Sequence, residues 1–250
     1  DPTRPTIGAT DREKYPQMNR IPDLLGWNIY PGWYGGSKSL ENFGTWLDQR
    51  RYASRSGGFC VSEYGAGANP AQHEENARQP KTNGQWHPEE WQAHVHETDW
   101  AAIKSRSFVW GSFAWNMFDF SSSGRHEGDI PAINDKGLVT IDRQIKKDAF
   151  YFYKANWSDE PTLYITGRRF TDRTNNLADV KVYSNLPKPT LWLNGISIGS
   201  SDNRGAGVFI WKSISLIPGE NQIEVRAYDK EHHEITDKCI WKLTSSNSSL

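Results

Sequence analysis

The sequence predicts a chain of two parts, an α/β part followed by an all-β part. In the first part, short apolar runs alternate with segments of helical spacing, which is typical of a parallel sheet with crossover helices. In the second part, short alternating runs follow one another with turn residues between them, which is typical of an antiparallel β-sandwich. The pattern changes at Asp159-Glu160-Pro161, so we expect domains at residues 1–158 and 159–250.

Composition and charge exclude several classes of function. The chain has 250 residues, of which 36% are hydrophobic and 13% aromatic, and its net charge is -1. This balance favours neither nucleic acid nor an anionic membrane as a partner. No run approaches the roughly 18 consecutive apolar residues that a membrane-spanning helix needs. Cys60 and Cys239 are expected to be buried small hydrophobic residues rather than a disulfide.

The α/β part contains four apolar runs that predict strands, at residues 6–9, 24–29, 59–62 and 108–117. Helices are predicted from apolar spacing at residues 39–53, from 87–106, where Pro88 stands at the first helical position, and from 146–157. A closed (β/α)₈ barrel needs eight strand-and-helix units and typically about 250 residues. Four units therefore fit either a small open α/β domain or half of a barrel.

The all-β part contains six runs that predict strands, at residues 162–167, 178–184, 189–200, 207–216, 221–229 and 238–244. Asn194-Gly195 divides the third run and is a favoured two-residue hairpin turn. Pro218-Gly219 predicts a further turn.

Glu63 is the candidate catalytic residue because it stands where the third apolar run ends and glycines begin. Catalytic groups of a parallel barrel lie where strands end, although a lone Glu there is more often a solvated strand end. The ends of neighbouring runs add further polar and aromatic residues, namely Asn28, Tyr30, Trp33, Tyr34, Trp115, Asn116 and Asp119. A tyrosine hydroxyl would keep Glu63 ionised, and Trp115 would offer a sugar an apolar platform. Core packing explains each tryptophan equally well when it is taken singly.

Five blocks of the sequence resemble consecutive blocks of glycoside hydrolase family 2, the family of β-galactosidases, β-glucuronidases and β-mannosidases. They are "DPTRPTIGAT", "GWNIYPGWY", "CVSEYGAG", "FVWGSFAWNMFDF" and "NDKGLVTIDRQIKKDAFYFYKANW". The similarity covers residues 1 to about 158 in order. Residues 160–247 resemble the immunoglobulin-like domains that follow the barrel in bacterial members.

The resemblance implies that residues 1–158 are the C-terminal half of a (β/α)₈ TIM barrel, strands 5 to 8, followed by an immunoglobulin-like β-sandwich. It implies that Glu63 is the nucleophile of a retaining enzyme and that Tyr30 supports it. The substrate-binding residues expected from the resemblance and from the strand ends are Asn28, Trp33, Tyr34, Trp115, Asn116, Asn134 and Lys136. Asn134 and Lys136 belong to an "N-x-K-G" loop that approaches the bound sugar in the family.

The expected general acid/base is missing from this sequence. Members of the family use the Glu of an Asn-Glu pair, and no such pair occurs before Glu63. Asp119, Glu127 and Asp129 do not match that position. We therefore expect a fragment that holds the nucleophile and is inactive alone.

No metal site is predicted within the chain. His94 and His96 are two positions apart on a predicted helix and point away from each other, so they are expected to be solvated, together with His73, His87 and His126. The resemblance adds Mg²⁺ or Na⁺ only for the full-length parent, for which it suggests a periplasmic or secreted bacterial enzyme. The exposed half-barrel is expected to self-associate.

Three hypotheses of function follow. The first is part of a retaining exo-β-glycosidase that acts on terminal β-linked sugars, with β-galactosidase before β-glucuronidase. Asn134-x-Lys136 resembles the pair with which β-glucuronidases hold a carboxylate, since a lysine there can neutralise a uronic acid, but galactosidases have a similar "NDKG" loop. The second is a non-catalytic carbohydrate-binding protein in which Trp115, Trp33 and Tyr30 stack on sugars. The third is a purely structural domain.

Overall fold

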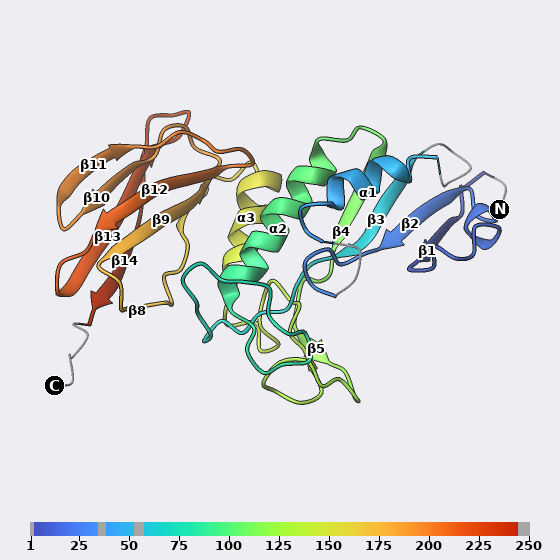
Figure 1. Cartoon of the computed structure of the whole chain (residues 1–250). Helices are drawn as coiled ribbons and strands as arrows, with labels where there is room; N and C mark the ends of the chain where they lie inside the picture. The colour runs from blue at the N-terminus through green and yellow to red at the C-terminus, as the bar shows by residue number, and fades with distance from the viewer. Residues whose placement is uncertain (1–2, 35–38, 53–57, 245–250) are drawn as a thin grey trace. The chain divides into compact units, whose positions relative to one another are not determined.

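The computed structural model describes residues 3–34, 39–52 and 58–244, and it divides into two compact units (Figure 1). Unit 1 comprises Asp1–Asn69 and Glu74–Ile145, and unit 2 comprises Pro70–His73 and Lys146–Leu250. Contacts thus group the last predicted helix with the second unit. The predicted domain boundary at 158/159 was placed where the alternating strand pattern of the sequence begins, and it stays a prediction.

Unit 1 is built on a parallel sheet in the order β1-β2-β3-β4. The strands are β1 (Ile7–Thr10), β2 (Leu24–Asn28), β3 (Phe59–Tyr64) and β4 (Val109–Ala114). Phe59, Cys60 and Val61 of β3 are all fully buried, because a central strand of a parallel sheet is covered on both faces. The four strands predicted from apolar runs are therefore confirmed.

The helices of unit 1 are α1 (Phe43–Gln49), α2 (Glu89–Lys104) and a 3₁₀ turn at Met18–Arg20. Pro88 is the N-cap of α2 rather than its first helical residue, a shift of one position that is common at helix ends. Glu89 and Glu90 in the first turn and Lys104 in the last turn complement the helix dipole. The two short strands β5 (Phe120–Ser121) and β6 (Ile133–Asn134) form an antiparallel hairpin after β4.

Unit 2 begins with α3 (Asp148–Trp157) and continues as two sheets. The sheet of five strands has the order β11-β10-β13-β14-β8, and the sheet of three has the order β12-β9-β7. The bounds are β7 (Leu163–Ile165), β8 (Asp172–Arg173), β9 (Leu177–Ser184), β10 (Thr190–Leu193), β11 (Ile196–Ser200), β12 (Val208–Ser215), β13 (Gly219–Tyr228) and β14 (Glu234–Leu243). All pairings are antiparallel except the short contact of β8 with β14.

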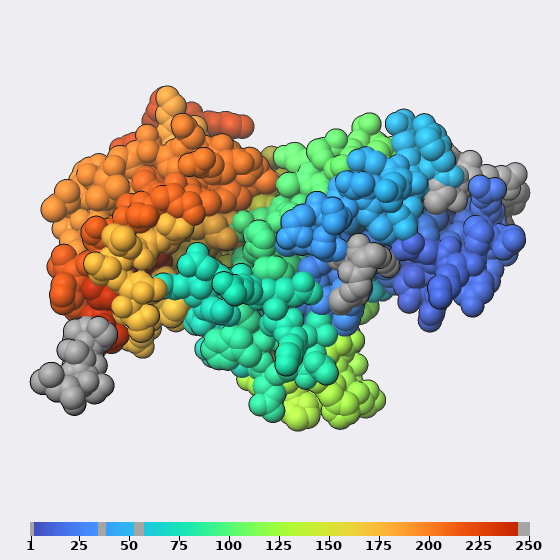
Figure 2. All heavy atoms as spheres, in the orientation of Figure 1, coloured from blue at the N-terminus to red at the C-terminus, as the bar shows by residue number. Residues whose placement is uncertain are grey.

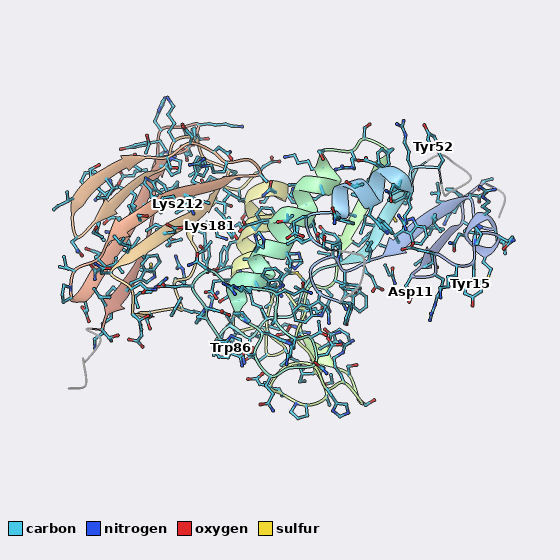
Figure 3. The ribbon with its side chains drawn as sticks, viewed as in Figure 1. Asp11, Tyr15, Tyr52, Trp86, Lys181 and Lys212 are labelled. Carbon is cyan, nitrogen blue, oxygen red and sulfur yellow. The ribbon has the colours of Figure 1, made fainter. Side chains whose placement is uncertain are left out.

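The two sheets of unit 2 share one apolar core. Val180 and Trp211 from the smaller sheet and Val225 and Trp241 from the larger one belong to the same buried cluster. The predicted hairpin turn is present between β10 and β11, where Asn194 and Gly195 have φ of 49° and 80°. On the outer side of the smaller sheet, Lys212 forms a 2.6 Å ion pair with Asp179 (Figure 3).

Cys60 and Cys239 are both free, as expected, but Cys60 is buried whereas Cys239 is only half-buried. Burial raises the pKa of the Cys60 thiol to about 11 and that of Cys239 to about 12, which keeps both thiols protonated and unreactive near neutral pH. Among the helices in the described ranges, none combines the length and the apolar character needed to cross a bilayer.

Gly137 provides a test of how tightly the loops of unit 1 are packed. A Cβ at this position would lie 2.0 Å from the backbone nitrogen of Asp119 and 2.4 Å from the carbonyl carbon of Phe118. Because backbone atoms cannot rotate away, we expect Gly137→Ala to lower the free energy of unfolding by roughly 1–3 kcal/mol, the usual cost of overpacking. Urea denaturation measures the change. Gly111→Ala on β4 is the matched control, since among the described residues its Cβ would meet only Cys60, at 3.8 Å. Equal losses in both variants would contradict the steric argument.

The outer strands of the parallel sheet lead to a second prediction. β1 and β4 end the sheet within the described residues, and β4 leaves Trp110 and Phe113 46% and 60% exposed. Unpaired edges and exposed aromatic side chains favour pairing with another chain. Sedimentation velocity should therefore show association that increases with protein concentration. A monomer at every concentration would count against this expectation.

Candidate active site

The carboxyl ends of three parallel strands are held side by side by backbone hydrogen bonds. The amide of Ile29 donates to the carbonyl of Glu63 at 2.8 Å, and the amide of Trp115 donates to the carbonyl of Tyr64 at 2.8 Å. In the sheet register, Asn28 of β2 is opposite Glu63 of β3. The candidate residues predicted at strand ends from three separate segments therefore meet at one edge of the sheet.

Glu63 and Tyr30 form the central contact of this edge. The Tyr30 hydroxyl donates a hydrogen bond to Oε2 of Glu63 at 2.7 Å, and both side chains are half-buried. Burial, and then the hydrogen bond to the Glu63 carboxylate, raise the pKa of Tyr30. The phenol therefore stays protonated and remains a hydrogen-bond donor to the Glu63 carboxyl group. The tyrosine–glutamate contact expected from the sequence is present.

The side chain of Asn28 bonds to Ser62, although in the sheet register Asn28 is opposite Glu63. Its Oδ1 accepts a hydrogen bond of 2.7 Å from the hydroxyl of Ser62, the residue before Glu63. Gly26 makes room for this contact, because a Cβ there would lie 2.7 Å from Ser62 Oγ. Ser62 was not a candidate, and only its place beside Glu63 could have suggested it.

Lys136 is a buried ammonium in an aromatic pocket. The residue is only 1% exposed, and its Nζ lies 2.8 Å from Oε2 of Glu127. The same Nζ lies 5.0 Å from the ring centroid of Tyr34, 5.2 Å from that of Trp33 and 6.0 Å from that of Tyr30. These distances allow cation–π attraction. Tyr30 thus contacts the Glu63 carboxylate through its hydroxyl and lies near Lys136 through its ring.

The loop that carries Lys136 is fixed by its own backbone. Asn134 Oδ1 accepts from the Lys136 amide at 3.1 Å, and the carbonyl of Lys136 accepts from the Asn116 amide at 3.1 Å. Asp119 Oδ1 accepts from the amide of Gly137 at 2.8 Å. The side chain of Asn134 therefore stabilises the loop. Asp119, an acidic residue predicted at the strand ends, also stabilises this loop.

The aromatic candidates differ in how much of each ring is accessible. Trp33 is 0% exposed, and its ring contacts that of His87. No face of the Trp33 ring is therefore accessible to a ligand. Tyr34 is 37% exposed, and Trp115 is half-buried with its ring 6.0 Å from that of Phe120. Asn116 donates to the carbonyl of Phe118 at 2.7 Å, while its buried Oδ1 has no hydrogen-bond partner in the part of the chain that the structure describes.

Arg125 and Glu127 complete the cluster from the loop between β5 and β6. Arg125 Nη1 lies 2.8 Å from Glu127 Oε2, and the Tyr34 hydroxyl donates to Oε1 of Glu127 at 3.2 Å. This loop is tied to the loop after β3 by a bond from the Gly128 amide to the Gly84 carbonyl. Figure 2 shows the two segments, teal and yellow-green, in contact at the surface. The sequence marks the loop only by glycines on either side.

The histidines of unit 1 are not all solvated. His87 and His96 are both 0% exposed, and His87 Nδ1 lies 2.5 Å from Asp135 Oδ2. The prediction of solvated histidines is therefore wrong for these two. The helical spacing did not indicate that His87 is buried, because it precedes α2 and is buried by loop residues.

Exposed aromatic residues lie elsewhere on loops, as Tyr15, Tyr52 and Trp86 do (Figure 3).

Comparison with known proteins adds relatives to this geometry. A family profile described as "Domain of unknown function (DUF4982)" matches residues 175–236. A β-glucuronidase of Bacteroides fragilis is 41% identical over 92% of this chain and 33% of its own length. A putative β-glucuronidase of Formosa agariphila is 32% identical over 95% of this chain and 31% of its own length. The chain thus spans about a third of these curated relatives.

Solved structures give a similar result. A putative β-galactosidase from Bacteroides fragilis has a TM-score of 0.89 and 34% identity, covering 98% of this chain and 36% of that one. An FMN-binding β-glucuronidase from Facaelibacterium prausnitzii L2-6 has a TM-score of 0.87 and 35% identity, covering 100% and 37%. Bacteroides uniformis β-glucuronidase 2, covalently bound to cyclophellitol-6-carboxylate aziridine, has a TM-score of 0.80 and 27% identity, covering 98% and 29%. These relatives are glycoside hydrolases.

Removal of the Tyr30 hydroxyl tests the central contact. Tyr30→Phe should lower the free energy of unfolding by roughly 1.5–3 kcal/mol, the usual range for a hydrogen bond to a charged group. Tyr34→Phe is the control from the same cluster, because its longer bond to Glu127 is more exposed and should contribute less than about 1 kcal/mol. Urea denaturation of both variants measures the difference. A smaller loss for Tyr30→Phe than for Tyr34→Phe would contradict the assignment.

Proposed function

We propose that this chain carries the nucleophile side of the active site of a retaining β-glycosidase of glycoside hydrolase family 2. The observation that supports the proposal is the 2.7 Å hydrogen bond from Tyr30 to Glu63 at the carboxyl ends of neighbouring parallel strands. Glu63 attacks the anomeric carbon of a terminal sugar while the bond from that carbon to the leaving-group oxygen breaks and a general acid protonates the oxygen. Water then hydrolyses the covalent glycosyl-enzyme. On this proposal, residues 1–158 are strands 5 to 8 of a (β/α)₈ barrel, and the sandwich is immunoglobulin-like.

The chemistry of this reaction assigns distinct tasks to the residues present. Glu63 must be ionised to attack, and the Tyr30 hydroxyl supports its charge. Trp115 and Tyr34 are the half-buried and exposed rings available to a sugar face. Retention also needs a second carboxyl about 5–5.5 Å from the nucleophile. Glu127 is bound by two cations, and Asp119 accepts a hydrogen bond from the Gly137 amide. We therefore propose that the acid/base comes from a segment that corresponds to the two thirds of the relatives outside the matched region.

The sugar we propose first is a terminal β-linked glucuronide. Lys136 supplies a buried ammonium near the Tyr30 ring. Glu127 is its partner in this structure, and the N–H donors that Glu127 leaves open would bind a carboxylate on the sugar. Relatives named β-glucuronidase support this choice, whereas the resemblance of the sequence alone put β-galactosidase first. A β-galactoside remains the second candidate, since the Bacteroides fragilis structure with 34% identity is named a putative β-galactosidase.

A uronate-shaped covalent probe tests the proposal. Cyclophellitol-6-carboxylate aziridine forms a covalent complex with the Bacteroides uniformis relative. Ring strain activates its leaving nitrogen, so capture by a nucleophile depends less on a partner acid than glycoside hydrolysis does. We expect the chain to gain the mass of one probe molecule, with the modification on Glu63 by peptide mass spectrometry.

Glu63→Gln is the matched control and should remain unlabelled under the same conditions. Steady-state turnover of nitrophenyl β-glycosides by the chain should be absent, because the carboxylate that activates water in the second step is supplied from elsewhere. Probe attached to another residue, or no labelling at all, would overturn the role of Glu63. If the chain turns over nitrophenyl β-glycosides and Glu63→Gln abolishes this turnover, the claim that the acid/base is missing from the chain is wrong.

A further inference from the structure

Glu127 already occupies the position at Lys136 that a carboxylate ligand would take. Its Oε2 lies 2.8 Å from Lys136 Nζ and 2.8 Å from Arg125 Nη1, so two cations converge on one oxygen atom. Its Oε1 accepts from the hydroxyl of Tyr34 at 3.2 Å. Glu127 comes from a loop between two glycines of positive φ, Gly124 and Gly128. The carboxylate is therefore a resident ligand of the Lys136 pocket.

The ammonium of Lys136 has donors to spare. A lysine ammonium has three N–H donors, and in the described residues Glu127 is the one hydrogen-bond acceptor recorded for it. Its other close neighbours are the aromatic rings of Tyr30, Trp33 and Tyr34. A buried cation with unfilled donors is suited to a further acceptor, and an aromatic ring is a weaker partner than a carboxylate.

Other charged groups lie around this cluster. Arg125 and Lys136 carry positive charges, Glu127 carries a negative charge, and the Asp135 carboxylate also acts on Arg125 electrostatically. A sugar carboxylate would share Lys136 with Glu127, and two carboxylates on one ammonium repel each other at short range. A neutral sugar meets no such competition.

We propose that Glu127 determines the selectivity of this site between acidic and neutral sugars, by competing with a sugar carboxylate for Lys136 and Arg125. The inference rests on the proposed function, because it assumes that the sugar binds beside Tyr30 and Glu63. Glu127 acts as an internal counter-ion that a uronate must displace. Glu127 therefore lowers the affinity of the site for uronates and leaves its affinity for neutral sugars unchanged.

Binding of D-glucuronate and D-galactose by calorimetry tests this role on the chain and its variants. Glu127→Gln keeps the shape of the side chain and removes the competing charge. We expect its affinity for glucuronate to rise at least about tenfold, the equivalent of one charged hydrogen bond. Its affinity for galactose should change by less than about threefold. Glu127→Asp keeps the charge but shortens the reach to Lys136, and it should show a smaller gain for glucuronate.

Asp129→Asn is the control for net charge. Asp129 lies on the same loop and accepts a hydrogen bond of 2.6 Å from Asn69 Nδ2, and the substitution removes the same unit of charge. A gain for glucuronate in Asp129→Asn equal to that in Glu127→Gln would assign the effect to the general field, and it would overturn the proposal. Thermal unfolding of each variant confirms that it is folded.

The outcomes separate the failure of this inference from the failure of the proposed function. If glucuronate and galactose both bind but Glu127→Gln leaves their ratio unchanged, the role of Glu127 is wrong and the sugar site stands. A loss of glucuronate affinity in Glu127→Gln would mean that Glu127 positions Lys136 instead of competing for it, which also overturns the inference. If no variant binds either sugar, the proposed function is wrong, and the inference with it.

Discussion

The parallel pairing of β2, β3 and β4 is the constraint on which the candidate site depends. At the carboxyl ends of these strands, the backbone bonds from Ile29 to Glu63 and from Trp115 to Tyr64 continue the sheet beyond its last regular residues. Buried backbone groups must be paired, so the chain cannot turn away before these positions. Three segments that are distant in sequence therefore deliver their first loop residues to one edge.

Burial of charge explains how the rest of the cluster is organised around that edge. A lysine as deeply buried as Lys136 requires a partner of opposite charge, and Glu127 supplies it from a loop of its own. The rings of Tyr30, Trp33 and Tyr34 lie 5.0–6.0 Å from the Lys136 ammonium. The nucleophile candidate and the cationic pocket are thus linked through Tyr30, and the properties of one depend on the other.

Backbone contacts with little side-chain freedom position the loops. Gly137 fits against Asp119 with no room for a Cβ, and the amide of Gly128 donates to the carbonyl of Gly84. The loops that carry Lys136 and Glu127 are consequently attached to the segment that follows β4 and to the loop after β3. The β-sandwich has an apolar core of its own, formed from both of its sheets.

The sequence by itself determined the local structure and the position of Glu63. Runs of apolar residues specify the four parallel strands and the strands of the sandwich, because periodicity reflects burial, with the exception of the short β8, which no run predicted. Asn194-Gly195 specifies its hairpin through backbone conformation. The tertiary structure alone decided the partners: Glu127 against Lys136, Ser62 against Asn28, the burial of Trp33 and the burial of His87. Such contacts join loops whose paths have no periodicity, and the packing of other segments creates them. Local sequence therefore fixes where a side chain stands along a strand, and only the folded chain fixes what it faces.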